Sequence, residues 1–159
     1  MHDESADSHE RRQFIAFYSG DQPFAADIMA IREIRGWTET TPLPHAPDYV
    51  RGAINLRGIV LPVVDLKAQL GRGLTEVTAK HAIIVVTAAG RSMGLLVDAV
   101  SDILTVKASE IQPAPDLARA EAAAFIEGIA VLGETMVTIL SMKQLMASLG
   151  GDAPNAIAA

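Results

Sequence analysis

The chain has 159 residues, of which half are hydrophobic, 19 are acidic, 13 are basic and none is cysteine. This length suits one domain or two very small ones, and no apolar run reaches the roughly 20 residues that span a bilayer. The lack of cysteine excludes disulfides, thiolate nucleophiles and cysteine metal sites. The net charge of −6 and the scattered basic residues provide no cationic patch of the kind that binds nucleic acid.

Both ends of the chain are predicted to lie outside the folded domain. Residues 1–12 are polar and acidic, which predicts a disordered tail and argues against a signal peptide. Residues 148–159 are expected to form a flexible C-terminal tail. Together with the absence of cysteine, these features favour a cytoplasmic location.

The first half alternates apolar segments with turn residues, which predicts two hairpins. Their strands are expected over 13–19 and 23–28, and then over 53–56 and 59–65. Arg57 and Gly58 would form the second turn. Between the hairpins, the three prolines of residues 40–49 exclude helix and strand pairing. A short helix over 66–71 is expected to end this half.

The second half predicts a similar order of elements. Strands are expected over 82–88 and 92–97, with a turn at Ala89 and Gly90, and a last hairpin over 129–140. Between them lie a strand running into a proline loop over 105–117 and an alanine- and glutamate-rich, helix-compatible stretch over 118–128. An amphipathic helix over 141–150 is expected to follow.

The two halves resemble one another in sequence as well as in the order of their elements. Two pairs of segments align, 24–34 with 93–103 at an offset of 69, and 52–66 with 128–142 at an offset of 76. A β-unit of this size buries little apolar surface alone, so we interpret the repeat as two similar units packed together. The predicted fold is mainly β, with one five-stranded barrel per half and a few short helices.

Apolar residues recur at every third position at one place in each half. These residues are Ile28, Ile31 and Ile34 in the first half, and Val97, Val100 and Ile103 in the second. Strand side chains repeat every two residues, so this spacing indicates a turn of helix or a bulge between strands. Two related apolar faces would then meet at a groove between the units. The alternative is that these positions are ordinary core residues.

No motif for an enzymatic reaction is found in the sequence. It has no G-x-S-x-G nucleophile elbow, no phosphate-binding loop and no H-E-x-x-H zinc motif. The histidines His2, His9, His45 and His81 are far apart, so no metal or other cofactor is predicted. Asp65 follows a strand and precedes a helix, which favours helix capping over catalysis. We therefore expect the function to reside in binding surfaces.

Several segments resemble the CheW family of bacterial chemotaxis coupling proteins. They are "EIRG" at 33–36, "PDYVRGAINLRGIVLPVVDL" at 47–66, "GLLVDAVSDIL" at 94–104, "EIQPAPDL" at 110–117 and "EGIAVLGETMVTILSMKQL" at 127–145. The resemblance covers residues 13–147. It implies two interleaved SH3-like barrels, from sequence halves at about 13–75 and 80–147, and a non-enzymatic adaptor.

The resemblance also implies the partners and their sites. A protein of this family links the cytoplasmic tip of methyl-accepting chemoreceptors to the regulatory domain of the histidine kinase CheA, in arrays at the membrane but without inserting into it. The receptor groove would use six residues, namely Ile28, Ile31, Glu33, Arg57, Val97 and Val100. The kinase contact would use Gly52, Gln112 and Leu117. An apolar groove suits a helix face, and a guanidinium on a tight turn suits directional hydrogen bonds across an interface.

One departure from the family pattern concerns the kinase contact. Gln112 and Leu117 stand where the family often has a basic residue and an aromatic residue, which commonly dominate interfaces. Two related functions remain open, a coupling protein of a non-flagellar chemosensory pathway and the coupling half of a scaffold with a phosphoreceiver domain. The opposing class, an enzyme or small-ligand barrel, would need polar groups gathered inside a pocket.

Overall fold

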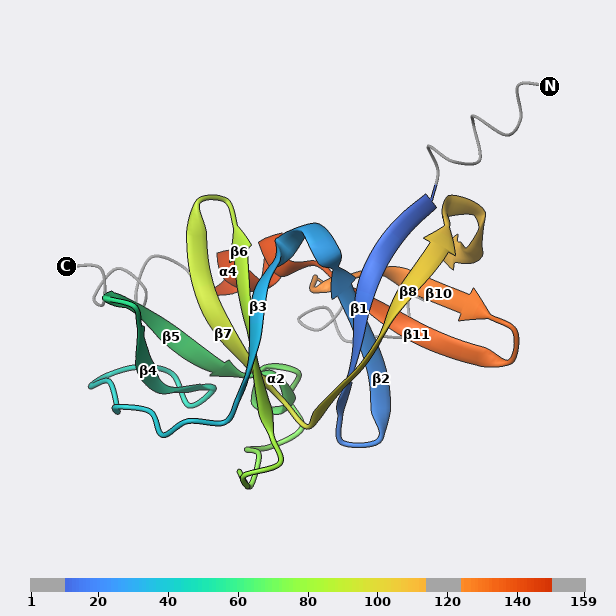
Figure 1. Ribbon diagram of the computed structural model, residues 1–159. Helices are drawn as coiled ribbons and strands as arrows, with labels where there is room; N and C mark the ends of the chain where they lie inside the picture. Colours follow the sequence, from blue (N-terminus) through green and yellow to red (C-terminus); the bar gives the residue numbers. More distant parts are fainter. Residues whose placement is uncertain (1–10, 114–123, 150–159) are drawn as a thin grey trace.

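The computed structural model describes residues 11–113 and 124–149, which form two sheets around a shared core (Figure 1). Subdomain A has the strand order β8-β1-β2-β11-β10-β9, and subdomain B has the order β3-β6-β7-β5-β4. The strands of subdomain A are β1 (Arg11–Ser19), β2 (Gln22–Asp27), β8 (Ala99–Lys107), β9 (Ile111–Gln112), β10 (Ile126–Leu132) and β11 (Thr135–Leu140). The strands of subdomain B are β3 (Ile31–Gly36), β4 (Val50–Leu56), β5 (Ile59–Asp65), β6 (Ala82–Ala88) and β7 (Arg91–Val97). The helices are η1 (Ile28–Ala30), α2 (Leu66–Gln69), η2 (Ala108–Glu110) and α4 (Met142–Ser148).

The predicted architecture, mainly β with two units and few short helices, is confirmed. The expectation, drawn from the internal repeat, of one separate barrel per half is wrong, because the halves exchange their first hairpins, as an interleaved arrangement of two barrels requires. Strands β1 and β2 come from the first half but pair with β8 and β11, whereas β6 and β7 come from the second half and pair with β3 and β5. Local alternation specifies a hairpin but not the sheet that it joins. Subdomain A also gains a sixth strand, the two-residue β9.

The strand register preserves the internal repeat. In the two parallel pairs, Val63 lies opposite Gly94 and Ile139 lies opposite Ala25, positions that correspond under the offsets of 76 and 69. The antiparallel register of β4–β5 and of β10–β11 shifts beside the glycine that opens each aligned segment. The two subdomains are therefore related structures with the same pairing pattern.

The segments with apolar residues at every third position adopt different conformations in the two halves. In the first half Ile28 begins the 3-10 helix η1, whose backbone N–H at Met29 donates to the Asp27 carboxylate at 2.9 Å. In the second half no helix forms, and only Asp98 separates β7 from β8. The predicted turn of helix is thus confirmed for the first half, and in the second half the pairing of β1 with β8 shifts register between Val100 and Ile103, in agreement with the alternative of a bulge.

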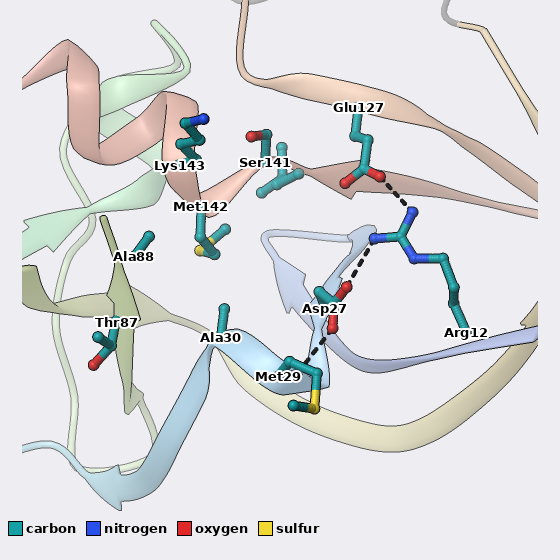
Figure 2. A pocket seen from close by; sticks show the side chains of 11 residues that line it. Arg12, Asp27, Met29, Ala30, Thr87, Ala88, Glu127, Ser141, Met142 and Lys143 are labelled. Atoms are coloured by element: carbon teal, nitrogen blue, oxygen red, sulfur yellow. Dashed lines mark hydrogen bonds and ion pairs between the residues drawn. The ribbon is translucent and has the colours of Figure 1, made fainter. Parts of the chain in front are cut away.

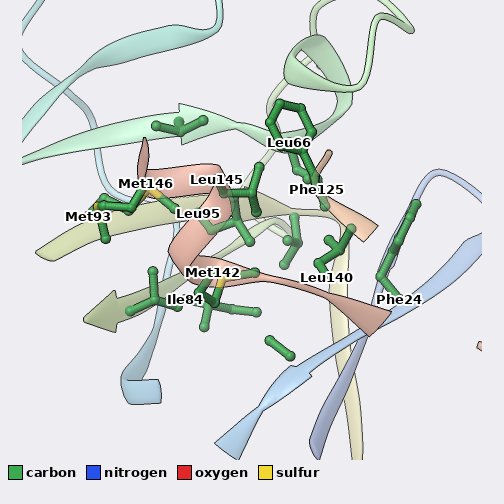
Figure 3. Packing of buried hydrophobic residues seen from close by; sticks show 14 of the residues in the cluster. Phe24, Leu66, Ile84, Met93, Leu95, Phe125, Leu140, Met142, Leu145 and Met146 are labelled. Atoms are coloured by element: carbon green, nitrogen blue, oxygen red, sulfur yellow. The ribbon is translucent and has the colours of Figure 1, made fainter. Parts of the chain in front are cut away.

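A central hydrophobic cluster joins the subdomains (Figure 3). Phe24 of subdomain A and Leu95 of subdomain B both belong to it. Helix α4 adds Met142, Leu145 and Met146, which are all buried. Because this cluster draws on both sheets and on α4, burial of apolar surface holds the two subdomains in one arrangement.

Some predicted boundaries move in the structure. Strand β1 begins at Arg11, so the last two residues of the predicted tail, Arg11 and Arg12, belong to a strand paired with β8. The helix-compatible stretch 118–128 lies partly outside the described residues, and its end is strand, since β10 begins at Ile126. Among the described helices, none is long and apolar enough to cross a membrane.

Replacing Leu145 with alanine should destabilise the whole fold. The Leu145 side chain is fully buried in the central cluster, so its truncation leaves a cavity between the subdomains. The free energy of unfolding, measured by urea titration, should fall by about 2–5 kcal/mol. Gln144→Ala changes an exposed neighbour on the same helix and should change that free energy by less than about 0.5 kcal/mol. Equal effects of the two substitutions would contradict a shared core that depends on α4.

Candidate interaction surface

An ion pair joins the β4–β5 turn to the edge strand β3. Arg57 Nη2 donates to Glu33 Oε1 at 2.6 Å, and Arg35 Nη1 donates to Glu33 Oε2 at 3.2 Å. The Arg57 side chain is 70% exposed, whereas that of Glu33 is 28% exposed. The pair therefore presents a guanidinium to solvent that is held in one orientation by a more buried carboxylate.

The turn owes its shape to two residues with positive φ, as a two-residue hairpin of this type requires. Arg57 has φ 53° and Gly58 has φ 87°. The Asn55 carboxamide oxygen accepts a hydrogen bond from the backbone N–H of Gly58 at 2.8 Å, which closes the turn. The predicted turn at Arg57 and Gly58 is thus confirmed, and its geometry directs the arginine side chain back toward Glu33.

The electrostatics of Glu33 follow from its two arginine partners. The hydrogen bond from Arg57 is the main cause that lowers the pKa of Glu33, and the hydrogen bond from Arg35 contributes in the same direction. Glu33 is therefore ionised at neutral pH. Beside it lies a shallow depression of about 110 Å³, with Leu56, Ile59 and Leu61 in its wall. The surface thus combines a fixed charge pair with apolar contact area.

Three of the four apolar residues assigned to the groove are partly accessible. Ile28 lies in η1, Ile31 begins β3 and Val100 lies near the start of β8, and all three are half-buried. Val97 is only 1% exposed and belongs to the central cluster. The expectation that Val97 is exposed is therefore wrong, because at the end of β7 it lies opposite Ala82 with its side chain in the core.

The residues assigned to the kinase contact differ in their surroundings. Gly52 is buried in β4 with φ 141°, and a Cβ atom there would lie 2.4 Å from the backbone oxygen of Thr41. Gln112 is exposed on β9. Leu117 lies outside the described residues. The structure therefore explains Gly52 by backbone packing, while Gln112 is available to a partner.

Sequence reasoning missed several residues at these surfaces. Arg35 shares Glu33 with Arg57, and Ile59 and Met29 are 62% and 88% exposed although both are apolar. Their positions beside a hairpin turn and within η1 could have marked Ile59 and Met29 as exposed, since residues at loop tips reach solvent. No sequence motif indicated the hydrogen bond between Arg35 and Glu33, which lie two residues apart on the same face of β3.

A second hollow, which we term the junction pocket, lies between the subdomains and holds about 310 Å³ (Figure 2). Arg12 at its edge donates to Asp27 at 2.8 Å and to Glu127 at 2.5 Å. The hydrogen bond with Glu127 is the main cause that raises the pKa of Arg12 above its usual value, while burial opposes it. Among the described residues, no group of histidine and acidic side chains is arranged to hold a metal ion.

Comparison with known proteins gives a consistent result. The model of the CheW-like domain matches residues 13–150. The chain is 51% identical to the chemotaxis protein CheW of Rhizobium meliloti (strain 1021) over 86% of its own length and 88% of that protein. It is 32% identical to the chemotaxis protein CheW of Klebsiella aerogenes, covering 86% and 82% of the two chains. The crystal structure of the scaffolding protein TtCheW from Thermoanaerobacter tengcongensis is similar with a TM-score of 0.78 and 31% identity, over 84% of this chain and 91% of that one.

Replacing Gly52 with alanine should strain the backbone. Both the positive φ and the close approach of Thr41 oppose a side chain at this position, so we expect unfolding to become easier by roughly 2 kcal/mol or more. Gly58→Ala is the matched control, because its φ is also positive but no atom lies within 4 Å of the added Cβ. Thermal or urea unfolding should show the larger loss for Gly52→Ala, and the opposite order would refute this account.

Removing the Arg57 side chain should raise the pKa of Glu33. The hydrogen bond from Arg57 favours the charged carboxylate in the folded state, so its stabilising effect is present above the unfolded-state pKa of Glu33 and is lost as the pH falls through the lower folded-state value. Carbon-detected NMR titration of Glu33 in Arg57→Ala measures this shift directly. Arg32→Ala alters the same depression and should leave the titration of Glu33 nearly unchanged.

Proposed function

The chain belongs to the CheW-like family and is a chemotaxis scaffold protein without enzymatic activity, and we propose that it couples receptors to a histidine kinase. In this proposal it binds both the cytoplasmic tip of methyl-accepting chemoreceptors and the regulatory domain of a CheA-type kinase. It acts in the cytoplasm and is recruited to receptor arrays at the membrane. The observation that carries the proposal is the Arg57–Glu33 pair, which lies within the matched residues and offers an oriented guanidinium.

The receptor site is proposed to lie along the two edge strands β3 and β8. Each is the last strand of its sheet, and Ile31 and Val100 occupy corresponding positions on them. Ile28 extends the apolar surface through η1, and Val97 supports it from the core without contacting the receptor. An apolar stripe of this kind suits one face of a receptor helix, with Glu33 and Arg57 at its side to set the orientation of the helix.

The kinase site is proposed to use other parts of the surface. Gly52 would act through the backbone shape of β4, whereas Gln112 and Leu117 would contact the kinase domain directly. Since neither of these two side chains is aromatic or basic, the contact would depend more on shape and apolar area than on charged hydrogen bonds. A coupling role in a non-flagellar chemosensory pathway, or within a receiver-bearing scaffold, would use the same surfaces.

Charge exchange at the turn can separate a direct role of Arg57 from a structural one. Arg57→Glu should weaken binding to a receptor-tip fragment or to a kinase regulatory domain at least about tenfold, as expected when a central arginine contact is lost. The double variant Glu33→Arg with Arg57→Glu restores an internal ion pair with reversed polarity. If Arg57 contacts the partner, the double variant should bind as weakly as Arg57→Glu in isothermal titration calorimetry.

Controls for this experiment lie on the same chain. Lys80→Glu makes the same charge change at an exposed site and should bind normally, and circular dichroism should show that every variant is folded. Val100→Asp places a charge on the proposed apolar stripe and should reduce binding to the receptor fragment more than binding to the kinase domain. Wild-type binding to neither partner, both taken from the source organism, would overturn the proposed function.

A further inference from the structure

The helix η1 carries the most exposed large apolar side chain of the described residues, Met29, which is 88% exposed. A backbone hydrogen bond runs from the N–H of Ile31 to the carbonyl of Ile28, and Ala30 packs partly buried against the central cluster, but no residue of η1 is fully buried. A 3-10 helix of three residues has poor hydrogen-bond geometry and little stability of its own. Its conformation therefore depends on the contacts made at its ends.

The contact at the start of η1 is made by Asp27, the last residue of β2, whose two carboxylate oxygens bind two different partners. Oδ1 accepts a hydrogen bond from the backbone N–H of Met29 at 2.9 Å and so caps the helix. Oδ2 accepts a hydrogen bond from Arg12 Nη2 at 2.8 Å (Figure 2). A charge-assisted hydrogen bond of this kind restricts the rotation of the carboxylate. Arg12 thus keeps the capping oxygen of Asp27 directed at η1.

Arg12 is itself held by contacts on two other strands. Its Nη1 donates to Glu127 Oε2 on β10 at 2.5 Å. Its guanidinium carbon lies 4.8 Å from the centroid of the Phe14 ring on β1, within the range of a cation–π contact. Phe14 is fully buried. The guanidinium that reaches the cap of η1 is therefore supported by the sheet of subdomain A.

The second half contains a related contact at the corresponding place. Under the repeat offset of 69, Arg12 corresponds to His81 and Met29 corresponds to Asp98. The distance from His81 Nε2 to Asp98 Oδ2 is 3.7 Å, and Asp98 is the residue that separates β7 from the edge strand β8. In each half a basic residue beside the first hairpin thus contacts an acidic residue where the chain leaves that hairpin for an edge strand.

We propose that Arg12 is a positioning residue for the proposed receptor site, acting through the Asp27 cap on the conformation of η1. This inference rests on the proposed function, because η1 carries Ile28 and leads directly into Ile31 of the apolar stripe. A helix that already has its bound conformation does not have to be ordered when the receptor binds. Loss of Arg12 should therefore lower the affinity for the receptor and leave the affinity for the kinase unchanged.

The effect on η1 can be measured in the full-length protein without any partner. In ¹⁵N relaxation experiments the order parameters of the Met29 and Ala30 amides should be about 0.85 in the wild type, as in rigid backbone, and should fall towards about 0.6 in Arg12→Met. Glu127→Gln is the matched control, because it removes the charge of the other carboxylate and leaves Arg12 beside Asp27. It should keep the wild-type order parameters. Unchanged values in Arg12→Met, or an equal fall in Glu127→Gln, would overturn the inference.

Binding measurements then test whether η1 acts on the receptor site. In isothermal titration calorimetry Arg12→Met should bind a receptor-tip fragment about fivefold more weakly, as expected from the loss of one helix cap, and should bind the kinase regulatory domain within about twofold of the wild type. Arg12→Lys keeps the charge but not the forked geometry that reaches two carboxylates, and should recover part of the loss. Asp27→Asn keeps a capping oxygen but removes the charge that Arg12 binds. It should match Arg12→Met, with no further loss in the double variant.

The two measurements distinguish failure of this inference from failure of the proposed function. If the wild type binds no receptor fragment while the order parameters respond as described, the proposed function is overturned and Arg12 still positions η1. If the wild type binds the receptor fragment but Arg12→Met loses affinity for receptor and kinase equally, the inference is wrong. It is also wrong if the losses in Arg12→Met and Asp27→Asn add up in the double variant, because the two residues then act independently.

Discussion

The exchange of first hairpins between the two halves is the constraint on which the rest of this structure depends. The parallel pairs β5–β7 and β2–β11 each join strands that are remote in sequence, and parallel pairing requires a crossover connection. Neither half can complete its sheet without the other, so the halves fold as one unit. As a result β3 and β8, which end the two sheets, are held in a fixed relation through the central cluster. The receptor site proposed along these strands would therefore derive its rigidity from the core.

The β4–β5 turn places a residue other than glycine, Arg57, in an unfavourable backbone conformation. A positive φ is unfavourable for residues other than glycine by about 1–2 kcal/mol, yet Arg57 adopts φ 53°. Ala89 adopts nearly the same φ, 54°, in the β6–β7 turn, where no charged side chain is needed. The backbone therefore does not explain the arginine. Its side chain instead bonds Glu33 on β3 and presents a positive charge at the surface, which agrees with the binding role proposed for it.

Sequence patterns predicted those features that depend on neighbouring residues. The turns at Arg57–Gly58 and Ala89–Gly90, the cap at Asp65 and the helical turn at Ile28 are all local, and all are present. The exchange of hairpins, the burial of Val97 and the role of Arg12 depend on contacts between distant segments, which alternation does not encode. Arg12 in particular was predicted to lie in a polar tail. The sequence does not reveal its pairing with Glu127, because 115 residues separate the two side chains. The Glu33–Arg57 pair could be located only through the family resemblance, since 24 residues separate the two side chains.

The internal repeat also makes visible where the two halves have diverged. Asp65 and Ser141 correspond in position, and both cap a helix, α2 and α4 respectively. Within residues 11–113 and 124–149, however, only the aspartate accepts additional hydrogen bonds from a loop, at Thr75. A serine in the same place caps the helix with its single hydroxyl oxygen, whereas an aspartate has two carboxylate oxygens and can accept hydrogen bonds from the helix and from a loop together. The helix start is therefore the same in both halves, whereas the pocket beside Ser141 has been found only on the side of the serine cap among the described residues. An approximately symmetric fold thus has two unlike sites, a buried carboxylate bound by Thr75 in one half and a pocket lined by Ser141 and Lys143 in the other.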